Sequence, residues 1–281
     1  MITAEQIKKE MQQDLSCVST TNPLAIEARL KPRKKSAFFT EDPELITTLN
    51  KLLIVANTDI SVLIYGPSGV GKEAIAYRLH GARAGQFVTV NCGAIPTELL
   101  EAEFFGAVKG SYTGCTSTRE GYFAHAHEGT LFLDEMGELP LPMQAKLLRA
   151  LESRTYRAIG SERESTVTCR VVAATNKNIP SLIDQGLFRE DLYFRLAKIT
   201  LDIPSLVDRP GDARLLYCYY RYKVFTKHAS KEDIDKFMAN FTAPDRKSYW
   251  TKGNCRAIIS YCINEYLDTI VKLAIDKQKT T

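Results

Sequence analysis

A glycine-rich loop that ends in a lysine carries the clearest chemistry in this sequence. It follows an apolar run over 61–65 and precedes a segment over 74–80 that has helical character. Backbone N–H groups of such a loop, with the positive end of the next helix, point at nucleotide phosphates, and the lysine adds a mobile charge for the outer phosphates. We therefore expect ATP to bind at Gly66, Pro67, Ser68, Gly69, Val70, Gly71, Lys72 and Glu73. The alternative is a glycine turn that binds nothing, which the strand–loop–helix context disfavours.

The last position of this loop departs from the general pattern. Ser or Thr is usual there because its hydroxyl ligates Mg²⁺, whereas this chain has Glu73.

Two acids follow a second apolar run, over 130–133. An aspartate at a strand tip beside a phosphate loop can hold Mg²⁺, and an adjacent glutamate can orient and deprotonate the attacking water. We therefore assign the metal to Asp134 and the role of catalytic base to Glu135. Alone, such a pair is more often a capped helix start or a solvated turn, and the phosphate loop favours catalysis.

A third strand-like run, over 170–174, ends near Asn176. A neutral polar group at that tip could sense the outer phosphate of ATP. The alternative is a simple turn-forming asparagine.

The elements that must position these residues alternate along the chain. Strand-like segments are expected over 61–65, 87–90, 130–135 and 170–174, and helical ones over 45–56, 72–82 and 142–153. Short apolar strands separated by helices indicate an α/β fold with a parallel sheet and ligands at the strand ends.

The composition changes along the chain and suggests three parts. Residues 1–37 are polar and read as a linker or partner helix, 38–210 as the α/β domain, and 211–281 as a small all-helical domain. The parallel sheet would therefore be followed by a helical lid.

Bulk composition is that of a soluble globular protein. Hydrophobic residues make up 44% and charged residues 25% of the 281 positions, and the net charge is +4. The seven cysteines include no CxxC pair, so reduced thiols are expected. No run approaches the roughly 18 apolar residues of a membrane span. We expect a cytoplasmic protein with no membrane contact.

Several motifs in one order resemble the AAA+ domain of the sigma-54-dependent transcriptional activators, the bacterial enhancer-binding proteins. A phosphate loop ending in Lys-Glu is typical of that family, which accounts for Glu73. The other matching segments are 90–92, 105–115, 128–135, 147–151, 188–196 and 203–206. The resemblance runs from about residue 36 to 261 and implies an AAA+ P-loop ATPase that assembles as a hexameric ring.

The resemblance also implies roles for residues outside the phosphate loop. Asn91 matches the residue that couples the catalytic Glu135 to the nucleotide state. Arg189 and Arg195 match arginines that reach into the neighbouring subunit's site, where such fingers raise rates by about 10³–10⁵. Arg256 matches a lid arginine that contacts ATP. Taken alone, each arginine would more often form a surface ion pair, and it is their joint placement that favours these roles.

A further implied site is a loop that contacts the partner. In the family a glycine-bounded loop rises when ATP is bound and engages sigma-54. Its counterpart here is Gly110, Ser111, Tyr112, Thr113, Gly114 and Cys115. Ser111 and Cys115 replace alanines of the family motif and Tyr112 replaces phenylalanine. The lid departs as well, with Thr251 and Lys252 where the family has one proline.

The expected function is therefore ATP hydrolysis coupled to remodelling of sigma-54 RNA polymerase, with ATP and Mg²⁺ as cofactors. We expect neither a receiver domain nor a DNA-reading helix-turn-helix within the chain. The alternatives are a non-activating ring partner of a full-length relative, and a remodeller of some other protein complex.

Overall fold

The computed structural model describes residues 38–209 apart from 39, 41, 57 and 113, together with 211, 212, 216, 256 and 262. The segment 1–37, most of the expected helical domain over 211–281, and Thr113 lie outside the described residues. The chain divides into two compact units. One, the sheet unit, comprises 47–67 and 71–203; the other takes in 68–70 and the described residues of 38–46 and of the part beyond 203.

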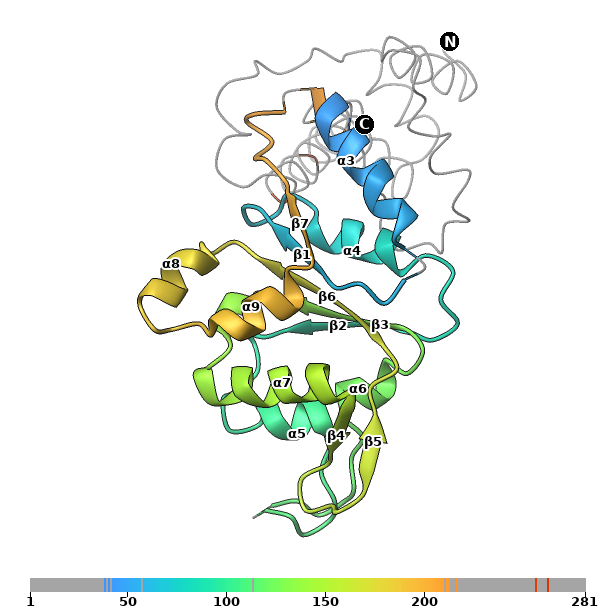
Figure 1. Ribbon diagram of the computed structural model, residues 1–281, viewed down its shortest axis with the longest axis vertical. Helices are drawn as coiled ribbons and strands as arrows, with labels where there is room; N and C mark the ends of the chain where they lie inside the picture. The colour runs from blue at the N-terminus through green and yellow to red at the C-terminus, as the bar shows by residue number, and fades with distance from the viewer. Residues whose placement is uncertain are drawn as a thin grey trace, which may run out of the picture. The chain divides into compact units, whose positions relative to one another are not determined.

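A five-stranded parallel sheet forms the centre of the sheet unit (Figure 1). Its strands lie in the order β2-β3-β6-β1-β7, and every neighbouring pair runs parallel. Their bounds are β1 Val62–Tyr65, β2 Phe87–Asn91, β3 Thr130–Asp134, β6 Arg170–Thr175 and β7 Ile199–Asp202. The four apolar runs of the sequence are four of these strands, as predicted. Strand β7 was not predicted, since its residues alternate between apolar and polar at the sheet edge.

Helices cover both faces of the sheet (Figure 1). The described helices are α3 Pro43–Ile54, α4 Lys72–His80, α5 Leu100–Phe105, α6 Tyr122–His125, α7 Leu141–Ser153, α8 Ile179–Asp184 and α9 Glu190–Leu196, with a 3₁₀ turn η1 at Met136–Glu138. None of the described helices combines the length and the apolar character that a membrane span requires.

Alternation along the strands divides the core between the two faces. Leu131 and Leu133 of β3 belong to the main apolar cluster with residues of α5, α6, α7 and α9. Phe132 points to the opposite face, on which α4 buries Ile75 and Leu79. The sheet is therefore covered on both faces, as expected for strands that are apolar along their whole length.

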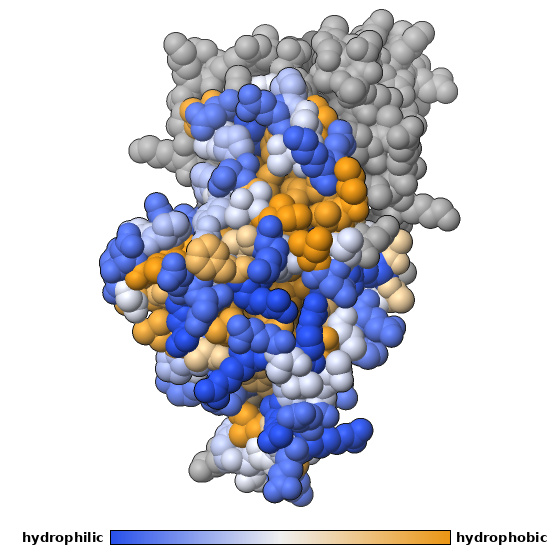
Figure 2. Space-filling model, in the orientation of Figure 1, coloured by the Kyte–Doolittle hydropathy of each residue, from blue (hydrophilic) through white to orange (hydrophobic). Residues whose placement is uncertain are grey.

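A two-stranded hairpin projects from the sheet unit (Figure 1). It consists of β4 Thr155–Arg157 and β5 Glu164–Thr166, paired antiparallel. Its base is fixed by Tyr156, whose ring stacks on Phe123 at a centroid distance of 5.5 Å. The end of the molecule that carries this hairpin is largely hydrophilic in the view of Figure 2.

A buried arginine fixes the start of β1. Arg170 is fully buried, and its guanidinium donates to the carbonyls of Ile60, Ala56 and Leu79, each at 2.9 Å. Desolvation lowers the pKa of Arg170 to about 10, so the group stays charged at neutral pH. Three backbone oxygens thus compensate one buried charge.

The second unit contains its own buried ion pair. Arg209 contacts Asp212 through Nη1, and both side chains are almost completely buried. The Arg209 guanidinium also lies 6.0 Å from the centre of the Phe38 ring.

Candidate functional site

The phosphate loop leaves the carboxyl end of β1 and enters α4, as the sequence predicts. Gly66 and Gly71 have φ values of 155° and 100°, which residues other than glycine rarely adopt. At the start of the loop, the N–H of Gly66 donates a hydrogen bond to the carbonyl of Thr175 in β6, at 3.2 Å. Its start is therefore held against the neighbouring strand.

The lysine of the loop lies back over the loop itself. Its Nζ donates to the carbonyl of Gly66 at 2.8 Å and to that of Pro67 at 3.0 Å. A flexible ammonium group in this position can turn to an incoming phosphate without a backbone change. Glu73, in the first turn of α4, is exposed.

The two acids lie at the carboxyl end of β3. Asp134 pairs in register with Asn91 of β2, and its Oδ1 accepts a bond from the N–H of Glu135 at 2.9 Å. Glu135 has φ 53° and ψ 40°, a left-handed conformation. For a residue other than glycine this costs on the order of 1–3 kcal/mol, and such strain clusters at functional sites.

Gly93 lies close to both the Glu135 carboxylate and the Asn91 side chain. A Cβ added at Gly93 would lie 3.0 Å from Glu135 Oε2 and 3.5 Å from Asn91 Oδ1. Asn91 Oδ1 also accepts bonds from the N–H groups of Gly93 and Ala94, at 2.9 and 3.2 Å. The sequence analysis did not single out Gly93; its signal is the Asn-Cys-Gly turn directly after β2.

Asn176 is exposed just beyond the end of β6. The residue before it, Thr175, is buried, and its hydroxyl accepts a bond from the N–H of Lys177 at 3.0 Å. Lys177 in turn forms an ion pair with Glu138 at 2.7 Å. The turn therefore leaves the Asn176 side chain on the same sheet edge as the phosphate loop and Asp134.

These residues fit Mg²⁺ bound together with phosphate. Among the described residues, no three or more His, Cys, Asp and Glu side chains form a metal-binding group. Mg²⁺ usually keeps several waters and binds through one or two carboxylates plus substrate phosphates. One aspartate at a strand tip, Asp134, beside a phosphate loop is therefore a sufficient protein contribution.

Cys92, next to Asn91, has no place in this chemistry as a nucleophile. The thiol is buried, and desolvation, with the nearby Asp134 and Glu135 charges, raises its pKa to about 12. It is a neutral packing residue at physiological pH.

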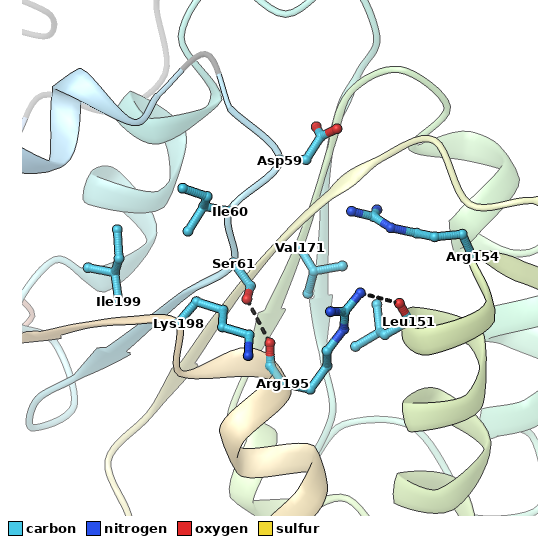
Figure 3. A pocket seen from close by; sticks show the side chains of 9 residues that line it. All are labelled: Asp59, Ile60, Ser61, Leu151, Arg154, Val171, Arg195, Lys198 and Ile199. Carbon is cyan, nitrogen blue, oxygen red and sulfur yellow. Dashed lines mark hydrogen bonds between the residues drawn. The ribbon is translucent and has the colours of Figure 1, made fainter.

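The two expected finger arginines lie in different places. Arg189, just before α9, is held by Asp191 through two bonds of 3.1 and 2.7 Å, and this contact raises its pKa and lowers that of Asp191. Arg195 lies at the other edge of the sheet, in the pocket of Figure 3, where its Nη2 donates to the carbonyl of Leu151. Its guanidinium is thus separated from its own phosphate loop by the length of β1.

Arg256 belongs to the second unit. Within that unit its Nη1 donates to the hydroxyl of Ser68, a phosphate-loop residue, at 3.2 Å.

The expected partner loop is a tight turn with its aromatic residue outward. The N–H of Gly110 donates to the carbonyl of Cys115 at 2.9 Å, and the N–H of Cys115 to that of Tyr112 at 3.0 Å. Tyr112 is 38% exposed, while Cys115 is buried and its thiol donates to the carbonyl of Val108 at 3.2 Å. Cys115 therefore stabilises the turn from inside the loop, and Tyr112 is exposed on its outer surface.

The loop is attached to the β4–β5 hairpin, which the sequence did not indicate. The N–H of Val108 donates to the carbonyl of Ile159 at 3.0 Å, and that of Ile159 to Gly106 at 2.9 Å. A Cβ added at Gly160 would lie 2.6 Å from the Cβ of Ser111. Loop and hairpin therefore form one arm.

Comparison with known proteins assigns the family. A family model described as the sigma-54 interaction domain matches residues 38–202, more than half of the chain. The chain belongs to the sigma-54 interaction domain family. The parallel sheet with a phosphate loop after β1 is accordingly the AAA+ P-loop fold, and the resemblance noted in the sequence is confirmed.

Relatives of this sigma-54 interaction domain protein are longer regulators. The chain is 38% identical over 258 residues to the transcriptional regulatory protein GlrR of Escherichia coli K12, covering 88% of this chain and 58% of GlrR. It is 49% identical over 175 residues to the sigma54-dependent transcriptional activator SfnR of Pseudomonas putida, covering 61% and 48%. The chain thus spans about half the length of the curated relatives it matches.

A solved relative carries a nucleotide. NtrX from Brucella abortus, crystallised in complex with ATP, matches with a TM-score of 0.69 and 28% identity, over 86% of this chain and 55% of NtrX. ATP binding in that fold agrees with a nucleotide site in this one.

Proposed function

We propose that this chain is the motor of a sigma-54-dependent transcriptional activator, hydrolysing ATP to remodel sigma-54 RNA polymerase. The observation that carries the proposal is the group at the carboxyl edge of the sheet. Asn91 and Asp134 end the neighbouring strands β2 and β3, Glu135 follows in a strained conformation, and Lys72 lies in the loop–helix segment after β1, at the same edge.

Each residue has a defined task in hydrolysis. Lys72 turns from the loop carbonyls to the outer phosphates, and the loop N–H groups bind the phosphate oxygens. Glu135 orients the attacking water and accepts its proton, while Asp134 would hold Mg²⁺, which would neutralise charge on the phosphates. Asn91 and Gly93 limit where the Glu135 carboxylate can lie, and Asn176 and Arg256 respond to the bound nucleotide.

The site is complete only in an assembly. Arg195 lies at the edge of the sheet away from its own phosphate loop, which supports its use, with Arg189, on the nucleotide of a neighbouring copy. A closed ring satisfies this head-to-tail requirement, and a hexamer is the ring that we propose. For this role the protein must be in the cytoplasm, where it has access to RNA polymerase.

The arm formed by the partner loop and the β4–β5 hairpin would contact the polymerase. Tyr112 at its tip offers a flat apolar ring with a hydroxyl that must stay hydrated or find an acceptor. Since Cys115 supports the turn from within and Ser111 faces Gly160, we propose that the contact depends mainly on Tyr112.

Trapping with ADP–aluminium fluoride, a mimic of the transferred phosphoryl group, tests this proposal. We expect the protein to retain sigma-54 in a stable complex, and Tyr112→Ala to lose the complex while it still hydrolyses ATP. Ile54→Ala removes another exposed apolar side chain and serves as the control. A protein that hydrolyses ATP but retains no sigma-54 would instead be a remodeller of a different complex.

A further inference from the structure

The pocket around Arg195 lies at the amino edge of the sheet (Figure 3). It has a volume of about 520 Å³ and is formed where β1, β6 and β7 begin and α7 ends. Its charged lining residues are Asp59, Arg154, Arg195 and Lys198. This pocket is distinct from the carboxyl edge that carries the phosphate loop.

The charge of the pocket is positive. Asp59, its one acid, already forms an ion pair with Arg83 at 2.7 Å. The side chains of Arg154 and Lys198 make no hydrogen bond or ion pair with the part of the chain that the structure describes. Together with Arg195 they leave the pocket with cations and no matching anion, and so it is suited to an anionic group.

Arg195 is held in place by neighbouring elements, and Arg154 is placed beside it by the end of α7. The backbone carbonyl of Arg195 accepts a bond from the hydroxyl of Ser61 at 2.8 Å, and its guanidinium is bound to Leu151 (Figure 3). Arg154 ends α7 in a left-handed conformation with φ 57°, and its side chain and that of Arg195 both extend toward Val171. Arg154 therefore occupies a position that glycine would adopt with less strain.

The anion cannot be the phosphates of the chain's own nucleotide. From Ser61 at the amino edge to Gly66 at the carboxyl edge is about 16 Å of extended chain. A nucleotide that meets Arg195 must therefore come from another molecule.

We propose that Arg154 and Lys198 bind, beside Arg195, the phosphate chain of a nucleotide held by a second copy of this chain. The inference rests on the proposed function and adds two residues to the trans half of its site. The guanidinium of Arg154 offers the paired donors that phosphate oxygens accept, and Lys198 adds a point charge.

Steady-state ATP turnover by Arg154→Gln and Lys198→Gln tests the proposal. Each variant should lower kcat by about tenfold or more, the worth of one hydrogen bond to a charged group. Arg154→Lys should lose less than Arg154→Gln. Arg157→Gln is the matched control, because this exposed arginine pairs with Glu164 on the hairpin and does not line the pocket.

Mixing two impaired chains shows on which copy these cations act. Glu135→Gln keeps an intact pocket but cannot hydrolyse ATP, whereas the double variant Arg154→Gln/Lys198→Gln keeps the phosphate loop and Glu135. We expect the mixture to turn over ATP faster than the sum of its parts, because one chain supplies the pocket for the nucleotide of the other.

The outcomes separate the two proposals. An unmodified protein that hydrolyses ATP, with both pocket variants equally active, overturns this inference alone. A mixture no faster than the sum of its parts overturns the action in trans. No Glu135-dependent turnover by the unmodified protein overturns the proposed function and this inference together.

Discussion

At the scale of single residues, Glu135 is constrained in both its backbone and its carboxylate. Its backbone is left-handed, its N–H is bound to Asp134, and its Oε2 lies beside Gly93. The first two features fix the backbone of Glu135, and the approach to Gly93 limits its carboxylate. A small change at Gly93 is therefore expected to act on catalysis without touching the phosphate loop.

Gly93→Ala should lower kcat by about threefold to tenfold, because displacement of a catalytic group by about 1 Å can cost about 10²-fold and the carboxylate would have to shift by a few tenths of an ångström. The new methyl would meet Oε2 at 3.0 Å, so the carboxylate must move. ATP affinity, measured separately by equilibrium binding, should remain that of the unmodified protein. A variant with full kcat would show that Glu135 is not held at this point.

The buried thiols give the sheet unit a pH dependence on the alkaline side. Burial raises the pKa of Cys169 from 9.0 to about 11. Below pH 9 the folded and unfolded states both hold the proton; above it the unfolded state loses its proton first, so stability falls as pH rises to 11. The slope is up to about 1.4 kcal/mol per pH unit for this thiol.

Urea unfolding between pH 8 and 11 measures that slope. Cys169→Ala should lose stability less steeply with pH than the unmodified protein, whatever the cost of the substitution at pH 8. Equal slopes in the two proteins would contradict the assignment.

At the scale of elements, the partner loop and the β4–β5 hairpin act as one arm. The close approach of Gly160 to Ser111 has no room for a side chain, and Gly160 has φ 77°. A side chain at this position would push the loop away from the hairpin. Loop position is thus set by a residue that lies more than forty positions further along the chain.

Gly160→Ala should weaken trapping of sigma-54 while basal ATP turnover stays unchanged, because the collision at 2.6 Å displaces Ser111 and the tip beyond it. Gly186→Ala is the matched control: Gly186 has φ 67°, but an added Cβ would meet nothing within 4 Å. Both variants should lose about 1 kcal/mol of stability from backbone strain. Equal trapping by the two would show that the hairpin does not position the loop.

The elements also show what the sequence could and could not predict. The phosphate loop, the acids at the end of β3 and four of the five strands were recognisable because continuous apolar runs mark buried parallel strands. Strand β7 and the hairpin were not, since Ile199–Asp202 lies at an edge and Glu164–Thr166 is fully exposed. Gly93 and Gly160 were missed because their importance depends on contacts with residues distant in sequence.

At the scale of the whole molecule, the proposed function assigns the two edges of one sheet to different nucleotides. The carboxyl edge holds the phosphate loop and Glu135, whereas the amino edge holds Arg195 in a positive pocket. The sequence and its family resemblance suggested that Arg195 acts on a neighbour. The structure agrees with that proposal, because the length of β1 separates the arginine from its own loop.

The dependence of ATP turnover on protein concentration tests this division most directly. Turnover per chain should be very low in dilute protein and rise steeply to a plateau as copies assemble, with Glu135→Gln inactive throughout. Turnover per chain that is the same at every concentration, in a protein shown by sedimentation to be monomeric, would contradict a site shared between copies.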